Sequence, residues 1–153
     1  TEHDEAIRRS TIGWVTADEP YLWIYDKLAA TVGRANRSYG FDLIGFTEDL
    51  QFTEYAGAGA FYTWHQDGLD GDLAARKLSM VVQLSDPGDY EGGDLEFFSL
   101  DGDGAAADPD RRVATRARGT VIVFPSFEYH RVTPLQSGTR RSLVCWVGGP
   151  PFR

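Results

Sequence analysis

The chain of 153 residues is long enough to bury the core of one domain and too short for two full domains. Hydrophobic residues make up 42% and charged residues 25% of the sequence, which excludes an intrinsically disordered chain. Fifteen Lys and Arg residues stand against 23 Asp and Glu residues, and the net charge of −8 disfavours a nucleic-acid partner because phosphate binding needs a basic face.

The first predicted element is a helix over about residues 18–36. Asp18 is placed to cap its N-terminus, and Pro20 would lie in the first turn, where a missing backbone N–H costs little. Apolar residues recur at helical spacing along one side, with further apolar residues beside them: Tyr21, Ile24 and Leu28, then Leu22, Tyr25, Ala29 and Val32. The pattern predicts a well-buried helix.

From residue 41 onward the pattern changes to short runs rich in β-branched and aromatic residues. Gly, Pro, Asp or Ser bound these runs, which cover residues 41–46, 50–55, 77–84, 92–98, 119–125 and 140–147. Six or more strands behind a helix predict a mainly β fold, a jelly roll or double-stranded β-helix, with its core over about residues 41–148. No linker or repeat interrupts the sequence, so we expect a single domain over residues 1–153 with the helix as its N-terminal support.

A candidate metal site begins in the segment FYTWHQDG, residues 61–68. On an extended backbone, residues two apart point to the same side, so His65 and Asp67 can present an imidazole and a carboxylate to one point. A second part lies further along, where an apolar strand runs into a Pro-Ser turn and then His130. Two neutral imidazoles and one carboxylate form the facial triad that suits non-heme Fe(II) and leaves positions open for a co-substrate and oxygen.

Each of these residues also has an ordinary interpretation. A single His at a strand end is more often a surface or core histidine than a ligand, and Asp67 before a glycine can shape a turn. Arg140 can be a solvated charge at the start of a strand, beside an outward-facing Arg141. The combination favours a site: His-x-Asp on one strand, a distant His130, and an arginine beyond it.

Three stretches occur in order between about residues 41 and 147: YAGAGAFYTWHQD, KLSMVVQLSDPGDYEGGDLEFF and GTVIVFPSFEYHRVTPLQSGTRRSLVCWV. Together they resemble the prolyl-4-hydroxylase-like group of Fe(II)- and 2-oxoglutarate-dependent dioxygenases, and most of all a bacterial branch whose substrates are often unassigned. The resemblance implies that His65, Asp67 and His130 are the iron ligands. It also implies that Arg140 binds the distal carboxylate of 2-oxoglutarate, and a guanidinium suits that role because it grips a carboxylate bidentately.

Three further residues are predicted beside the co-substrate. Tyr55 matches a family tyrosine that forms a hydrogen bond with the co-substrate. Tyr62 matches the tyrosine of the family's tyrosine-x-x-histidine phrase near the iron, although it fits equally well as a packing aromatic. Strand alternation puts Ser142 on the same side as Arg140 and Trp146, so its hydroxyl can reach the same carboxylate.

The resemblance implies an enzyme that uses Fe(II), 2-oxoglutarate and O2, with ascorbate as a candidate reductant. Such an enzyme hydroxylates an unactivated C–H bond while 2-oxoglutarate is decarboxylated to succinate and CO2. We expect the substrate to be an amino-acid-like unit, either free, in a small metabolite or within a peptide. Collagen-type and algal prolyl hydroxylases have a lysine where this chain has Arg140, which argues against proline as the substrate.

Two other functions use the same residues. A zinc-dependent hydrolase would place the His-Asp-His set around zinc and use bound water as the nucleophile, but it leaves Arg140 unexplained. A non-catalytic jelly-roll binding module would use both histidines for structure alone. A closed structural zinc site is disfavoured because Cys145 lies inside an apolar run and His3 lies near the terminus.

Nothing in the sequence predicts contact with a membrane. No apolar stretch approaches the length of a membrane span, and the start TEHDEAIRRS lacks the hydrophobic region of a signal peptide. Cys145 is the single cysteine, so no intrachain disulfide forms and a reducing compartment is the simpler interpretation. We expect a cytoplasmic protein and leave its oligomeric state open.

Overall fold

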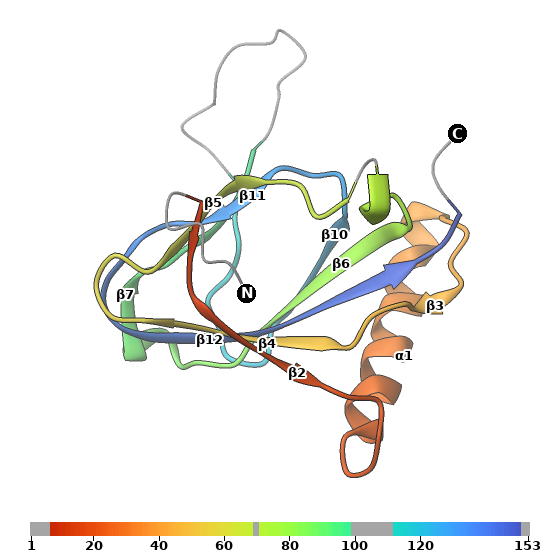
Figure 1. Ribbon diagram of the computed structural model, residues 1–153, viewed down its shortest axis with the longest axis horizontal. Helices are drawn as coiled ribbons and strands as arrows, with labels where there is room; N and C mark the ends of the chain where they lie inside the picture. The colour runs from red at the N-terminus through yellow and green to blue at the C-terminus, as the bar shows by residue number, and fades with distance from the viewer. Residues whose placement is uncertain (1–6, 69–70, 99–111, 151–153) are drawn as a thin grey trace, which may run out of the picture.

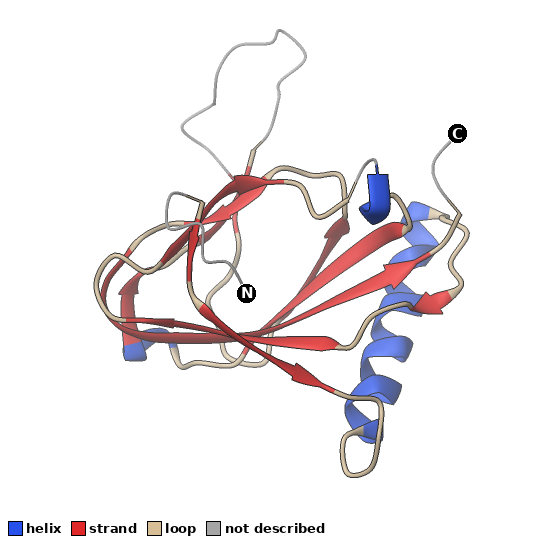
Figure 2. Ribbon diagram, viewed as in Figure 1, coloured by secondary structure: helices blue, strands red, loops and turns tan. Residues whose placement is uncertain are grey.

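The computed structural model describes residues 7–68, 71–98 and 112–150. In these residues, two antiparallel sheets face each other and one long helix covers the outer side of the larger sheet (Figure 1). Strands dominate over helix, and the sheets do not close into a barrel (Figure 2). The prediction of a mainly β jelly roll with a supporting helix is therefore confirmed. None of the described helices combines the length and the apolar composition that a membrane-spanning segment needs.

The larger sheet is organised around one long central strand. Its main strands lie in the order β10 (Val121–Pro125), β6 (Arg76–Gln83), β12 (Leu135–Gly148), β4 (Leu50–Ala56) and β2 (Thr11–Val15). Two short strands also pair with β12, namely β3 (Gly45–Phe46) and β7 (Tyr90–Gly92). Four described strands therefore hydrogen-bond to β12, which carries Arg140.

The smaller sheet joins the two halves of the predicted metal site. Its strands lie in the order β1 (Arg8–Arg9), β5 (Phe61–His65), β11 (His130–Val132), β8 (Leu95–Phe97) and β9 (Arg112–Val113). Strands β5 and β11 pair in antiparallel register, with His130 directly opposite His65. Sheet pairing thus brings together two histidines that lie far apart in the sequence.

Strand alternation gives the two faces of the larger sheet different tasks. One face packs with the helix and forms an apolar core that includes Leu50, Leu78, Met80, Leu143, Cys145 and Val147. The other face contributes to a pocket between the sheets, with Gln51, Thr53, Tyr55, Val81, Arg140, Ser142, Val144 and Trp146. Because successive side chains on a strand point to opposite faces, β4, β6 and β12 build both the core and the pocket.

The helix α1 (Leu22–Tyr39) is buried along a narrower stripe than predicted. Its buried side chains are Tyr25, Leu28 and Val32. The apolar residues Tyr21, Leu22 and Ala29 are exposed, so the prediction of a well-buried helix is wrong for this side. The physical reason is that only one sheet face packs against α1, and the opposite side of the helix faces solvent.

The start of the helix also differs from the prediction. Asp18 does not cap it with its side chain; its carbonyl accepts a 2.6 Å hydrogen bond from the backbone N–H of Tyr21 in a preceding turn. Pro20 lies in that turn rather than in the helix. At the other end, Gly40 adopts a left-handed φ of 66° and donates its N–H to the carbonyl of Asn36, which closes the helix.

Several strand boundaries were not predicted. The strands β1 and β2 precede the helix, where no strand was expected, and β12 begins five residues before Arg140. Within residues 41–46 only β3 pairs with another strand, and Ile44, which was expected in this strand, is 78% exposed. The sequence TIGWV of β2 is rich in β-branched and aromatic residues, yet it is a short edge strand whose Trp14 is 52% exposed.

Candidate functional site

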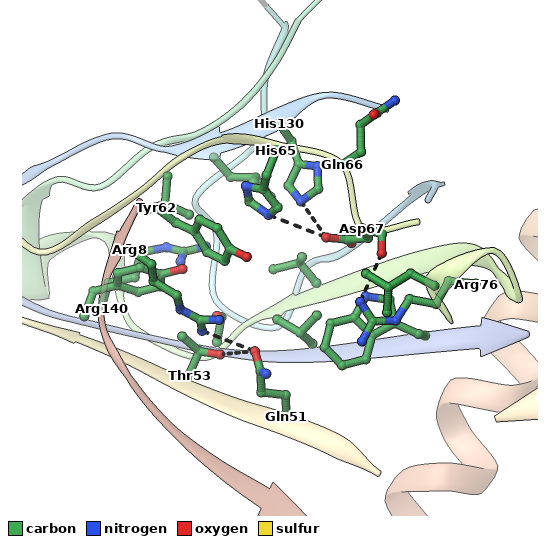
Figure 3. A pocket seen from close by; sticks show the side chains of 18 residues that line it. Arg8, Gln51, Thr53, Tyr62, His65, Gln66, Asp67, Arg76, His130 and Arg140 are labelled. Carbon is green, nitrogen blue, oxygen red and sulfur yellow. Dashed lines mark hydrogen bonds and ion pairs between the residues drawn. The ribbon is translucent and has the colours of Figure 1, made fainter. Parts of the chain in front are cut away.

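Three side chains from the smaller sheet and the segment after it converge on one point. His65 ends β5, Asp67 follows two residues later, and His130 begins β11 (Figure 3). Their candidate ligand atoms all lie within 4.8 Å of one another. Oδ1 of Asp67 is 3.5 Å from Nε2 of His65 and 3.2 Å from Nε2 of His130. The predicted triad is therefore assembled in the folded chain.

Backbone carbonyls orient both imidazoles of the triad. Nδ1 of His65 lies 2.7 Å from the carbonyl oxygen of Thr63, and Nδ1 of His130 lies 2.9 Å from that of Glu128. A carbonyl oxygen can only accept a hydrogen bond, so each Nδ1 carries the proton. In the neutral ring the lone pair is then on Nε2, the atom that faces Asp67. This donor set fits a divalent metal ion.

The second oxygen of the Asp67 carboxylate is held by buried hydroxyls. Ser79 donates a hydrogen bond to Oδ2 of Asp67 over 2.6 Å, and the Oγ atoms of Ser79 and Ser126 lie 3.0 Å apart. Both serines have no solvent exposure. The orientation of the carboxylate is thus fixed by Ser79 on β6, which is supported by Ser126 in the turn that follows β10.

Ser126 also anchors the backbone around Asp67. Its carbonyl oxygen accepts hydrogen bonds from the N–H groups of Asp67, at 2.9 Å, and Gly68, at 3.0 Å. A Cβ atom on Gly68 would lie 2.3 Å from the carbonyl oxygen of Leu73, so the chain packs where only glycine fits. The glycine of the HQDG segment is therefore required by close backbone approach.

Burial and mutual contacts set the ionisation of the triad. Burial alone raises the pKa of the Asp67 carboxyl, but the imidazoles of His130 and His65, which donate to it when they are protonated, and the Ser79 hydroxyl outweigh burial and hold this pKa far below its ordinary value. Burial lowers the pKa of His65. For His130 burial also acts to lower the pKa, but the hydrogen bond and charge of Asp67 and the contact with Glu128 together outweigh burial and raise the pKa. Asp67 is therefore ionised and available as a ligand at neutral pH.

A cavity of about 230 Å³ lies beside the triad, and all seven predicted site residues line it. Arg140 is 1% exposed, and its Nη2 donates a 2.9 Å hydrogen bond to Oε1 of Gln83. Its Nε has no hydrogen-bond partner among the described residues, and no described carboxylate pairs with the guanidinium. Ser142, 1% exposed, lines the same cavity, as strand alternation predicts.

The two predicted tyrosines lie on different walls of this cavity. Tyr55 is 4% exposed on β4, directly opposite Arg140 in the strand register, with the guanidinium carbon 5.4 Å from its ring centre. Tyr62 stacks on the imidazole of His65, with ring centres 3.6 Å apart. Burial raises the pKa of both hydroxyls, so both are protonated at neutral pH and can donate a hydrogen bond.

Neighbours of the site residues point away from the pocket and form contacts among themselves. Arg131 pairs with Glu96 and lies over the Trp64 ring, which faces away from the pocket as alternation predicts. Arg141 points outward and binds Glu54 at 2.9 Å, opposite in direction to its neighbour Arg140. His3, considered as a further ligand, lies outside the described residues.

Several residues of the site were missed from the sequence. Arg8 and Gln51 line the cavity, and Ser79 supports Asp67. Ser79 had a detectable signal, because it is a polar residue within the apolar run KLSMVVQL and shares a strand face with Val81. Arg8 had none, because it belongs to a strand of two residues.

Comparisons with known proteins give a consistent family. The model of the 2OG-Fe(II) oxygenase superfamily matches residues 50–148. A PKHD-type hydroxylase of Synechococcus sp. (strain CC9902) is 37% identical over 89 residues, which cover 58% of this chain and 36% of that protein. A PKHD-type hydroxylase of Stenotrophomonas maltophilia (strain R551-3) is 31% identical over 102 residues, covering 63% and 41%. The chain thus matches about two fifths of the length of these curated relatives.

Solved structures share the fold over nearly the whole chain. The crystal structure of a Pseudomonas putida prolyl-4-hydroxylase superposes with a TM-score of 0.76 at 26% identity, covering 98% of this chain and 77% of that chain. A prolyl hydroxylase from Trichoplax adhaerens, in complex with a peptide fragment of the hypoxia-inducible factor oxygen degradation domain, gives a TM-score of 0.74. At 20% identity, with 93% of this chain and 64% of that chain covered, this second likeness shows the fold alone.

Proposed function

Because the chain belongs to the 2OG-Fe(II) oxygenase superfamily, we propose that it is an Fe(II)- and 2-oxoglutarate-dependent dioxygenase. Its reaction would hydroxylate an unactivated C–H bond of an amino-acid-like unit. Bound iron, 2-oxoglutarate and O2 supply the oxidising chemistry, with release of succinate and CO2. In this proposal residues 1–153 act as one domain, and the chain's own side chains bind, orient and shield the reactants.

The observation that carries the proposal is the buried Arg140 in the same cavity as the triad. A guanidinium that is 1% exposed and has no described carboxylate partner is costly, unless an anion fills the cavity. The distal carboxylate of 2-oxoglutarate fits this position because a guanidinium binds a carboxylate bidentately. The hydroxyls of Ser142 and Tyr55 would add hydrogen bonds to the same co-substrate.

The iron would be held by Nε2 of His65, Oδ1 of Asp67 and Nε2 of His130. Two imidazoles and one carboxylate on one side of a metal ion leave the opposite side open for a co-substrate. Tyr62, stacked on His65, would hold that ring in place and direct its hydroxyl into the cavity. Ascorbate is proposed only as a reductant that keeps the iron ferrous.

The amino-acid-like substrate is either free, part of a small metabolite or within a peptide. The Trichoplax adhaerens neighbour, which shares the fold, is in complex with a peptide, so the peptidyl alternative stays among the three. The small cavity supports a single side chain or a small molecule as the reacting unit. A screen for substrate-stimulated succinate release identifies which of the three occurs.

Anaerobic titration with Fe(II) and 2-oxoglutarate tests the proposal. The parent protein should develop a weak visible absorption band when 2-oxoglutarate chelates Fe(II) at such a triad. His65→Ala should abolish the band, and Arg140→Ala should require a much higher concentration of 2-oxoglutarate. Arg141→Ala is the matched control, since this neighbour points outward.

Three results would contradict the proposal. One is a parent protein without the band, which would favour a binding module. Another is a pair of variants, His65→Ala and Arg140→Ala, that titrate like the parent. The third is turnover with zinc in the absence of 2-oxoglutarate, which would indicate a hydrolase.

A further inference from the structure

Arg8 places a third positive charge at the pocket, and the proposed reaction does not use it. The side chain is half-buried on β1 and lines the same cavity as the triad (Figure 3). Its guanidinium carbon lies 4.6 Å from the ring centre of Tyr62, which in turn stacks on His65. One aromatic ring therefore separates Arg8 from a proposed iron ligand.

The hydrogen-bond partners of Arg8 among the described residues are all neutral. Nε donates to the hydroxyl of Ser10, and Nη2 donates over 3.3 Å to Oε1 of Gln51. Gln51 is itself fixed by a 3.1 Å hydrogen bond from Thr53. No carboxylate of the described residues pairs with Arg8, so within this part of the chain its charge is oriented but not compensated.

Counting charges shows that the pocket keeps one positive charge in excess. Its described lining contains three arginines, Arg8, Arg76 and Arg140, against the carboxylate of Asp67. Glu48 compensates Arg76 through a 2.7 Å hydrogen bond from Nε to Oε2. The two positive charges of Fe(II) and the two negative charges of 2-oxoglutarate offset each other. One positive charge therefore remains in a chain whose net charge is −8.

We infer that Arg8 is a specificity-determining residue that binds a carboxylate of the substrate beside the iron. The inference rests on the proposed function and narrows it to substrates with one anionic group near the reacting carbon. The hydrogen bonds from Nε and Nη2 hold the planar guanidinium of Arg8 in one orientation. Binding of a carboxylate then requires no further ordering of this side chain. The excess of one charge matches a carboxylate better than a phosphate, which carries nearly two charges at neutral pH.

The carboxylate has two sources, and these are distinguishable. One is the backbone carboxylate of a free amino acid or of a chain terminus. The other is an Asp or Glu side chain within a peptide. A panel of three compound sets separates them: free L-amino acids, dipeptides with free or amidated C-termini, and amidated peptides with Asp or Glu against the same peptides with Asn or Gln.

Two readouts on the intact protein test the inference. Tryptophan fluorescence under anaerobic conditions, with Fe(II) and 2-oxoglutarate present, measures binding of each compound without turnover. Succinate release in air measures stimulation by the same compounds. We expect compounds with a carboxylate to bind and stimulate, and their amide partners to bind at least tenfold more weakly. Arg8→Gln should remove this difference, and Arg8→Lys should retain part of it.

Arg9→Gln is the matched control, because Arg9 is the exposed neighbour of Arg8 on the same strand. It should behave like the parent in both readouts. In Arg8→Gln, the anaerobic 2-oxoglutarate band and its titration midpoint should stay within about twofold of the parent. This result would show that Arg8→Gln weakens binding of the substrate carboxylate and leaves binding of 2-oxoglutarate and folding intact.

Four outcomes overturn the inference. The first is a parent protein that binds the acids and their amide partners equally. The second is a parent protein that binds no acid in the panel. A third is an Arg8→Gln variant whose main defect is a raised requirement for 2-oxoglutarate, which would make Arg8 part of the co-substrate site. The fourth is absence of the anaerobic band in the parent, because then the proposed function itself fails.

Discussion

Ser79 donates a 2.6 Å hydrogen bond to Oδ2 of Asp67, while Oδ1 of the same carboxylate faces the two histidines. The two oxygens of Asp67 are therefore not equivalent. Oδ2 is committed to a buried hydroxyl on β6, and Oδ1 remains for a metal ion. This arrangement favours a ligand that binds through one oxygen, which keeps more positions free than a carboxylate that binds through both.

Replacing Ser79 by alanine should weaken metal binding by about 10- to 100-fold, because the Asp67 carboxylate loses the hydrogen bond that orients it. Titration with Co(II), followed by its visible absorption, measures both affinity and coordination number. Ser85→Ala is the control, since Ser85 is also buried and accepts a 2.8 Å hydrogen bond from the backbone of Arg141. A Ser79→Ala protein with the parent's Co(II) affinity and spectrum would contradict this role.

Replacing Gly68 by alanine should disturb the metal site through the backbone. The new Cβ would lie 2.3 Å from the Leu73 carbonyl oxygen and 2.9 Å from Cβ of Arg76, so the segment carrying Asp67 must shift. We expect weaker Co(II) binding together with a lower midpoint of thermal unfolding. Gly88→Ala is the matched control, because nothing lies within 4 Å of a Cβ there. Parent-like affinity in Gly68→Ala would show that the loop relaxes freely.

Replacing Leu28 by alanine should lower the free energy of unfolding by about 2–5 kcal/mol, because Leu28 is 5% exposed in the core between α1 and the larger sheet. Urea unfolding followed by circular dichroism measures the change. Trp23→Ala, on the exposed side of the same helix, should change the free energy by no more than about 1 kcal/mol. A similar loss in both variants would mean that the exposed side of α1 is covered in solution.

The Cys145 thiol should be inert in the folded protein. Burial raises the pKa of this thiol to about 12, so almost no thiolate forms at pH 8. A thiol reagent should react slowly with the native protein and rapidly once urea is added. Because the folded pKa lies above the ordinary value, this residue's contribution to stability is complete below about pH 9 and falls as the pH rises further. Fast reaction of the native protein would contradict the burial.

The site residues that could be predicted are those whose chemistry and spacing form a pattern within a short stretch of sequence. Strand alternation predicted His65 and Asp67 on one side, and this holds although β5 ends at His65 and Asp67 lies just beyond the strand. Arg140 and Arg141 were correctly assigned to opposite faces for the same reason. That His130 lies opposite His65 is a matter of sheet pairing, which strand patterns alone do not specify.

The residues that could not be predicted depend on tertiary pairing. Arg8 reaches the pocket because a two-residue strand pairs with β5, and such a short strand leaves no periodic signal. The first turn of α1 is apolar on the side that faces solvent as well, since Leu22 and Trp23 are both exposed. Helical spacing identifies an apolar stripe, but the neighbouring sheet decides how wide a stripe is covered.

The division of the larger sheet into a helix side and a pocket side has a consequence for how the protein can change. Along β4, β6 and β12, alternate residues face either the pocket or the apolar core beside the helix. Selection for a new substrate can act on Thr53, Val81 or Val144 without touching Leu143, Cys145 or the helix. Because Val81 and Val144 also pack in a second apolar cluster on the pocket side, a library that keeps these two positions apolar should remain folded more often than one that admits charged residues there.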